Sequence, residues 1–162
     1  DSKYIFEDFG YNFSPSEISA AFALEQIKKL KSNFNTRTRN FKYLRNFFSI
    51  NDTFFEVPKD DLKIKTAWLA FPLLIKSNKY FDRTDLQIFL EKNNIQTRPI
   101  FSGNILRHPA FRKLNSSKNK VNTFKNSDYI MKNGLLIGCH QGLNKKKIDY
   151  IHKKITEFIK SI

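Results

Sequence analysis

The sequence predicts an α+β fold, in which a long N-terminal helix is followed by a small three-stranded sheet covered by helices on one side. Apolar residues recur at helical spacing near both ends of the chain, and three short apolar runs typical of strands lie between them. The 162 residues are 40% hydrophobic and include 17 phenylalanines, which is enough to build a core. The sequence contains no Gly-x-Gly-x-x-Gly fingerprint of a doubly wound nucleotide-binding fold.

Residues 15–48 are expected to form the long helix, either straight or bent. Ser14 is a candidate N-cap, Pro15 suits the first turn, and Glu17 stands where a capping-box partner belongs. Basic residues dominate the second half of this segment, whereas its first half carries an apolar face. That face consists of Ala20, Ala23, Leu24, Ile27, Leu30 and Phe34.

Strands and further helices are expected to alternate in the rest of the chain. The segment 51–61 resembles a turn with one short extended piece. The expected strands are 66–75, 95–100 and 135–140. The expected helices are 82–94 with Asp82 as its cap, 122–134 with Gly134 at its end, and a final helix whose apolar face is Ile148, Ile151, Ile155, Phe158, Ile159 and Ile162.

The composition limits the class of function. The net charge is +14, but 22 of the 29 basic residues are Lys, whereas base readers and phosphate clamps favour Arg. A basic nucleic-acid-binding module is therefore only an alternative to the enzyme function that other parts of the sequence favour. No apolar run approaches the roughly 20 residues of a membrane span. The single cysteine, Cys139, excludes an internal disulfide and a multi-cysteine metal site, so the expected compartment is the reducing cytoplasm.

Two segments carry polar chemistry that packing does not require. Asn12 stands just before a helix start, a place that phosphate groups favour; the alternative, which local chemistry alone favours, is that it merely caps or turns the chain. Arg98 ends a predicted strand and opens the stretch "RPIFSGNILRHPAF", in which Gly103, Asn104 and Arg107 follow. A guanidinium on a rigid strand suits bidentate binding of a carboxylate or phosphate, and a surface salt bridge is the alternative.

The histidines do not form a catalytic or metal centre. His108, His140 and His152 are far apart and lack the spacing of metal ligands. His140 follows a predicted strand, a position at which sites are often built, so it stays a weaker candidate. The sequence shows no complete catalytic set.

Several motifs together resemble one enzyme family. "GYNFSPSEISAAFALEQIKKL" is similar to the signature of the sugar-nucleotide aminotransferases and dehydratases of the DegT/StrS type, which are fold-type I pyridoxal-phosphate (PLP) enzymes. "TAWLAFPLLIK", "LEKNNIQTRPIFSGNILRHPAF" and "SDYIMKNGLLIGCHQGLNKKKIDYI" resemble the branch of the lipopolysaccharide O-antigen 3-dehydrases, which act on CDP- or GDP-4-keto-6-deoxyhexoses. The resemblance covers nearly the whole chain. Ser14, Ser19 and Ala23 depart from the usual signature, which puts substrate contacts from that turn in doubt.

The resemblance implies that residues 1–162 are the small C-terminal domain of such an enzyme. Residues 1–14 would leave the large domain, 15–48 would connect, and 49–162 would form the α+β body. The large domain would hold PLP or pyridoxamine phosphate (PMP), together with the active-site Lys of the aminotransferases or the His of the dehydrases. The domain alone is therefore expected to be inactive. An iron–sulfur cluster is left open, because its cysteines would lie upstream and Cys139 decides nothing.

The resemblance also implies roles for individual residues. Asn12 would reach the cofactor phosphate of the neighbouring subunit in a homodimer, and no catalytic residue is expected within the chain. The implied substrate-binding residues are Arg98, Ser102, Gly103, Asn104, Arg107 and His140. The implied partners are a nucleotide-linked 4-keto-6-deoxy sugar and an amino donor such as glutamate. The 3-dehydrase is the first expectation, and a nucleotide-sugar 4-aminotransferase is the alternative.

Overall fold

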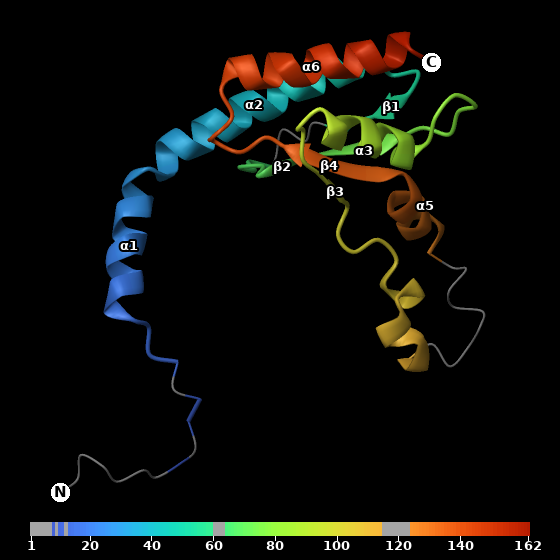
Figure 1. The fold of residues 1–162 in the computed structure, drawn as a ribbon. Coiled ribbons are helices and arrows are strands. Elements are labelled where there is room, and N and C mark those ends of the chain that lie inside the picture. Colours follow the sequence, from blue (N-terminus) through green and yellow to red (C-terminus); the bar gives the residue numbers. More distant parts are fainter. Residues whose placement is uncertain (1–7, 9, 12, 60–63, 115–123) are drawn as a thin grey trace, which may run out of the picture. The chain divides into compact units, whose positions relative to one another are not determined.

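The computed structural model describes residues 8, 10–11, 13–59, 64–114 and 124–162 (Figure 1). Residues 1–32 and 33–162 form two compact units. The elements are α1 (Glu17–Lys28), α2 (Leu30–Ile50), β1 (Phe55–Glu56), β2 (Ala70–Ile75), α3 (Arg83–Lys92), β3 (Thr97–Pro99), the 3-10 helices η2 (Ile105–Arg107) and η3 (Pro109–Leu114), α5 (Lys125–Asn133), β4 (Gly134–Gly138) and α6 (Lys145–Lys160). The α+β class is confirmed.

The start of α1 differs from the prediction. Its N-cap is Ser16 and not Ser14, and the Ser16 side chain makes no capping hydrogen bond. None of its residues is buried, and the side chains of Leu24 and Ile27 are 63% and 64% exposed. Within the unit 1–32, the predicted apolar face of the first helix is therefore exposed.

The single long helix predicted over 15–48 is divided at Lys29. This residue ends α1, and its backbone N–H donates to the carbonyl of Gln26 at 3.0 Å. α2 begins at Leu30 and continues to Ile50, two residues beyond the predicted end. Its buried positions lie in its second half, because only that part contacts the core.

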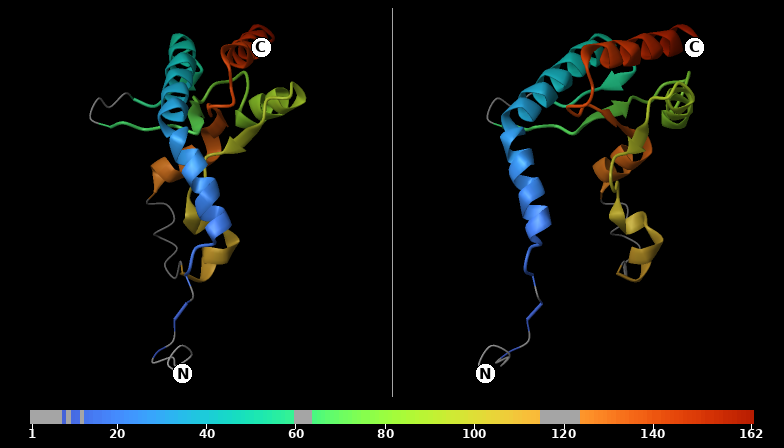
Figure 2. Two further views of the ribbon diagram at one scale, coloured as in Figure 1. Left: turned by 90° about the vertical axis from the view of Figure 1, so that its left-hand side faces the viewer. Right: turned by 60° about the vertical axis from the view of Figure 1, so that its left-hand side comes forward.

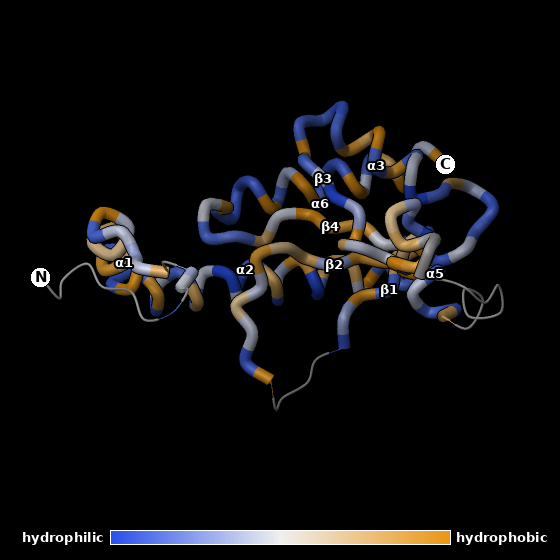
Figure 3. The backbone as a smooth tube through the Cα atoms, turned by 90° about the horizontal axis from the view of Figure 1, so that it is seen from below, coloured by the Kyte–Doolittle hydropathy of each residue, from blue (hydrophilic) through white to orange (hydrophobic). Residues whose placement is uncertain are grey.

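The described strands form one antiparallel sheet in the order β1-β2-β4-β3. Three strands were predicted, and the fourth is β1, in which Phe55 and Glu56 pair with Ile75 and Leu74. β4 occupies the centre of the sheet, since β2 pairs with it on one side and β3 on the other. The hydropathy of Figure 3 marks β2 and β4 as mostly apolar.

The two faces of the sheet differ in burial. Phe71, Leu73, Leu135 and Ile137 on one face are at most 1% exposed. Alternate residues on the other face, such as Leu136, are only half-buried. α2, α3 and α6 lie on the buried side in Figures 1 and 2, whereas α5 lies on the other side near the start of β4. The prediction that helices cover the sheet on one side is therefore correct for α2, α3 and α6 but not for α5.

Aromatic rings fill the space between the sheet and the helices. Phe71 of β2 lies between two rings of α2, with its ring centroid 5.2 Å from that of Phe41 and 5.6 Å from that of Phe48. Phe81 and Phe158 close the end of the core at α3 and α6, with an edge-on contact of 4.9 Å. The other buried members include Leu44, Phe55, Leu73, Ile75, Leu86, Leu90, Ile95, Leu135, Ile137, Cys139, Ile148, Ile151 and Ile155.

The two helices with the clearest local signals fold as predicted. Asp82 caps α3, and its side chain accepts from the backbone N–H of Thr84 and Asp85 at 2.6 and 3.1 Å. The Asp85 side chain in turn accepts from the Asp82 N–H at 2.9 Å, which completes a capping box. α6 buries four of its six predicted apolar positions, while Ile162 lies beyond its end.

His152 on α6 gives the fold a pH dependence. Its ring stacks on Phe47 at a centroid distance of 4.0 Å, and its buried Nε2 has no hydrogen-bond partner among the described residues. Burial lowers the pKa of His152; the carboxylate of Asp149 raises it and Lys145 lowers it. Because the folded pKa is depressed, the stabilisation is complete above the unfolded pKa of about 6.5 and is lost as the pH falls below it.

His152→Phe should therefore flatten the pH profile while keeping the stacking. Thermal unfolding of wild type should show a falling Tm between about pH 6.5 and 5, the range in which an unfolded histidine takes up its proton. The variant should fall less over the same range. Parallel profiles for the two proteins would contradict this role of His152.

Candidate functional site

Arg98 lies on the half-buried face of the sheet, opposite α2, α3 and α6, which is called the open face below. It pairs with Leu136 of β4, which in turn pairs with Pro72 of β2, and this row lies on the half-buried side. Its Nη1 donates to the Thr97 carbonyl at 2.8 Å. With the Gln96 amide assigned so that its oxygen faces Arg98, that oxygen accepts from Nη1 and Nη2 at 3.3 and 2.6 Å. The guanidinium is therefore oriented by its own strand and remains exposed.

The strand that carries Arg98 is anchored to α3 through Thr97. This residue is 1% exposed, and its backbone N–H and hydroxyl donate to Glu91 Oε1 at 2.6 and 2.7 Å. The side-chain and backbone hydrogen bonds of Thr97 lower the pKa of Glu91, and the charge of Arg98 lowers it further. The short edge strand β3 is thereby fixed in place although only three residues pair with β4.

The loop after β3 is held against α5. Gly103 has a positive φ of 67°, and a Cβ there would lie 2.6 Å from the Met131 side chain, so only glycine fits. The side chain of Asn104 is buried; it donates to Asp128 Oδ1 at 2.8 Å and accepts from the Leu106 N–H at 3.1 Å. Its two polar atoms are thus used inside the chain.

Arg107 takes part in the same cluster. Its Nε donates to Asp128 Oδ1, and its Nη2 donates to Oδ2 at 2.5 Å. In the structure both Asn104 and Arg107 fasten the loop through Asp128, and their predicted role in substrate binding stays a prediction. Ser102 is half-buried, and its carbonyl lies 2.8 Å from His108 Nε2.

Asp128→Asn is expected to release this loop from α5. Hydrogen bonds first from Arg107 and then from Asn104 lower the pKa of Asp128 from 3.8 to about 2. Because the folded pKa is depressed, the stabilisation is complete above about pH 4 and is lost as the pH falls through about 2. At neutral pH the variant should show faster amide exchange over residues 101–107 and a lower Tm. Asp52→Asn, in an exposed turn, is the control, and equal exchange in both variants would contradict the assignment.

The segment around His140 is held by α2. Asn40 is 2% exposed, and its Nδ2 donates to the carbonyls of His140 and Leu143 at 3.1 and 2.9 Å. Arg37 donates to the side chain of Gln141 at 2.7 Å. Sequence analysis missed Asn40, although one short amide between Arg39 and Phe41 on a buried helix face was a signal that could have revealed it.

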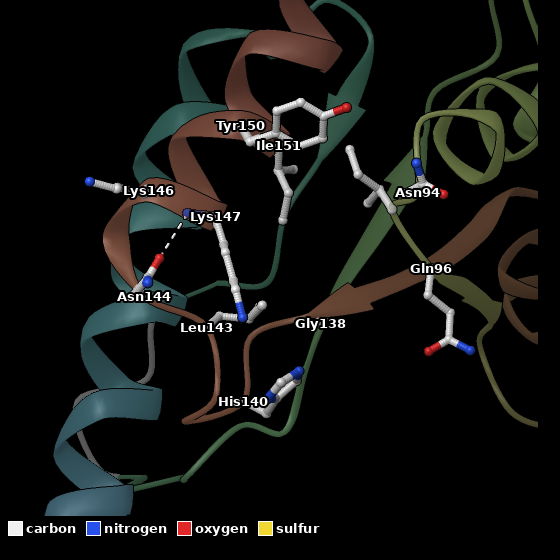
Figure 4. Close-up of a pocket in the computed structure, with 11 residues that line it drawn as sticks. Asn94, Gln96, Gly138, His140, Leu143, Asn144, Lys146, Lys147, Tyr150 and Ile151 are labelled. Atoms are coloured by element: carbon white, nitrogen blue, oxygen red, sulfur yellow. Dashed lines mark hydrogen bonds between the residues drawn. The ribbon is translucent and has the colours of Figure 1, made fainter.

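His140 lies at a pocket that Arg98 does not line. The pocket has a volume of about 600 Å³ and is bounded by the α3–β3 turn, the end of β4 and the start of α6 (Figure 4). Gln96, the neighbour of Arg98, lines it together with His140. Of the other predicted site residues, Arg98 lies on β3, and the loop and 3-10 helix after it carry Ser102, Gly103, Asn104 and Arg107. Asn12 lies outside the described residues.

The remaining reactive groups do not make a further centre. Burial raises the pKa of Cys139 to about 12, and its Sγ donates to the Trp68 carbonyl at 3.2 Å, so the thiol is unreactive. Within the described ranges no cluster of three metal-ligating side chains occurs. No helix of the described part of the chain has the length and apolar character of a membrane span.

Comparison with known proteins identifies the family. Residues 1–156 match the model of the DegT/DnrJ/EryC1/StrS aminotransferase family. The chain belongs to this family. It is 34% identical to the dTDP-4-dehydro-2,6-dideoxy-D-glucose 3-dehydratase of Saccharopolyspora spinosa, over 98% of this chain and 34% of that protein. It is 32% identical to the lipopolysaccharide biosynthesis protein RfbH of Salmonella typhimurium (strain LT2), over 98% of this chain and 36% of that protein.

A solved structure has the same fold. The GDP-4-keto-6-deoxy-D-mannose-3-dehydratase of E. coli, with bound hydrated PLP, matches with a TM-score of 0.77 and 29% identity. The match covers 93% of this chain and 38% of that one. The chain thus spans about a third of the length of the curated relatives it matches, which are 34% and 36% covered.

Proposed function

We propose that this DegT/DnrJ/EryC1/StrS-family chain is the C-terminal domain of a PLP- or PMP-dependent enzyme of nucleotide-sugar and lipopolysaccharide biosynthesis, a 4-keto-6-deoxyhexose 3-dehydrase. The observation that carries the proposal is the match of 98% of the chain to a named 3-dehydratase at 34% identity. In this proposal residues 1–14 leave the large domain, 15–48 connect the two domains, and 49–162 form the α+β body. A homodimer and a cytoplasmic location are also part of it.

The open face of the sheet supports a role in recognising substrate. Arg98 presents an exposed guanidinium there, and such a group binds carboxylate or phosphate in a bidentate manner. We assign it to the carboxylate of an amino donor such as glutamate or to the phosphates of a nucleotide-linked 4-keto-6-deoxy sugar. Ser102 and Gly103 would shape the adjoining wall, with the loop held in place through Asn104 and Arg107.

The cofactor would supply the amine and the electron sink of the reaction. Asn12 is proposed to reach its phosphate in the neighbouring subunit. That residue lies outside the described part of the chain. The described residues bind and orient the substrate, and none of them is assigned a proton transfer.

A 4-aminotransferase is the second candidate, because the family model itself is described as an aminotransferase family. The enzyme that contains this chain should be incubated with PMP, glutamate and, in parallel reactions, GDP-, CDP- and dTDP-linked 4-keto-6-deoxyhexoses. The products should be separated and their masses measured by mass spectrometry. A sugar that has lost its C3 oxygen identifies the dehydrase. A 4-amino sugar identifies the aminotransferase instead, and an unchanged sugar would overturn both candidates.

Arg98→Ala in that enzyme is expected to lower kcat/KM by about tenfold or more, as removal of a charged hydrogen bond does. The Tm should change little, because the side chain is exposed and its hydrogen bonds go to the Thr97 carbonyl and Gln96 next to it in sequence. Arg39→Ala, which removes an exposed arginine from α2, is the matched control. Steady-state kinetics equal to those of the control would remove Arg98 from the site.

A further inference from the structure

We propose that the pocket between α6, the end of β4 and the α3–β3 turn binds a small organic phosphate. Its volume of about 600 Å³ falls within the range of roughly 300–1,000 Å³ that small-molecule sites occupy. The proposal does not rest on the catalytic function, because the pocket is built entirely from described residues of this chain and binding can be measured on the chain itself.

The charge of the pocket is one-sided. Lys146 and Lys147 line it, and no Asp or Glu is among its described lining residues. In Figure 4 the side chain of Lys147 runs into the pocket, whereas that of Lys146 points away from its centre. Lys147 donates to the Gly142 carbonyl at 3.3 Å, which leaves donors of its ammonium group available. An uncompensated cation in a concave site favours an anionic ligand.

His140 adds a ring N–H donor to the same pocket. The backbone N–H of Gly142 donates to His140 Nδ1 at 3.1 Å, so Nδ1 is an acceptor and the ring N–H donor is Nε2. The ring lies against two glycines: an added Cβ would meet it at 3.4 Å at Gly138 and at 3.0 Å at Gly142. The local backbone therefore fixes both the position and the tautomer of the ring, and Nε2 lies toward Gly138, another lining residue.

Apolar side chains complete the pocket. Ile95 and Ile151 line it and are nearly buried, at 6% and 5% exposure. The ring of Tyr150 forms another part of the wall, and its hydroxyl donates to the Asn93 carbonyl at 3.1 Å, which ties α6 to the end of α3. A phosphate alone would leave this wall unused, whereas a ring joined to a phosphate would contact the wall and Lys147 together. The combination favours an organic phosphate over an inorganic one.

Calorimetric titration of the chain with adenosine 5′-monophosphate, inorganic phosphate and adenosine tests the proposal. The nucleotide should bind at least about tenfold more tightly than either half alone, because only it uses both the cation and the apolar wall. Nitrogen NMR of the free chain should show the proton of His140 on Nε2. A nucleotide that binds no better than inorganic phosphate, or no nucleotide binding at all, would overturn the proposal.

Matched variants locate the site. Lys147→Gln should weaken nucleotide binding about tenfold, the usual cost of losing a hydrogen bond to a charged group. Lys160→Gln removes the same charge from an exposed position about 20 Å along α6 and should leave affinity unchanged. His140→Ala should weaken binding as well, and His140→Gln, which keeps an N–H donor, should restore part of it. Equal losses in the two lysine variants would reduce the interaction to net charge and overturn the proposed site.

Discussion

Phe71→Ala is expected to lower the free energy of unfolding by about 3–5 kcal/mol. The side chain is fully buried at the centre of the sheet, and it contacts both Phe41 and Phe48 of α2. Its removal leaves a cavity between β2 and α2, because the surrounding rings belong to elements fixed by other contacts. Chemical denaturation followed by circular dichroism measures the change.

Phe101→Ala is the matched control for this prediction. Phe101 is 92% exposed, so the same truncation there should change stability by no more than about 0.5 kcal/mol. Since the two variants remove the same atoms, the difference between them measures burial. Similar free energies of unfolding for both would contradict the position of Phe71 in the core.

Asn40→Ala is expected to cost about 3 kcal/mol, because it leaves two partly buried carbonyls without their donor. The carbonyls belong to His140 and Leu143, so the loss falls on the segment that joins β4 to α6. Amide exchange over residues 140–144 should rise more than exchange in α3. The variant thus reports on stability and on the position of His140 together.

Asn46→Ala separates this effect from the helix propensity of alanine. Asn46 lies on the same helix but is exposed, so the substitution should be neutral or slightly stabilising. Unchanged exchange over residues 140–144 in Asn40→Ala would show that Asn40 does not hold the loop. The His140 donor of the proposed pocket would then lack its support from α2.

The elements that the sequence predicted well carry their signals locally. The Asp82 cap predicts the start of α3, and apolar residues that repeat at helical spacing predict α6. β1 was not predicted as a strand of the sheet, because two residues become a strand only through pairing with Leu74 and Ile75. A bend in the long helix was allowed for, but its position at Lys29 was not predicted, since no proline or glycine marks it.

In the candidate site, too, some features follow from local sequence and others from contacts between distant residues. The exposed position of Arg98 follows from strand alternation, which the sequence contains. The role of Asn104 does not follow from it, because its partner Asp128 is 24 residues away. The same holds for Asn40, whose bonds to the His140 loop span about 100 positions of sequence.

The sequence by itself therefore determined the family, the α+β class, the main helices and the strand position of Arg98. These depend on residue type and short-range spacing. Only the tertiary structure decided that Asn104 and Arg107 fasten a loop, that Asn40 holds the turn before α6, and that His140 and Lys147 share one pocket. These roles depend on which distant groups satisfy a buried hydrogen bond, and chain folding alone brings those groups together.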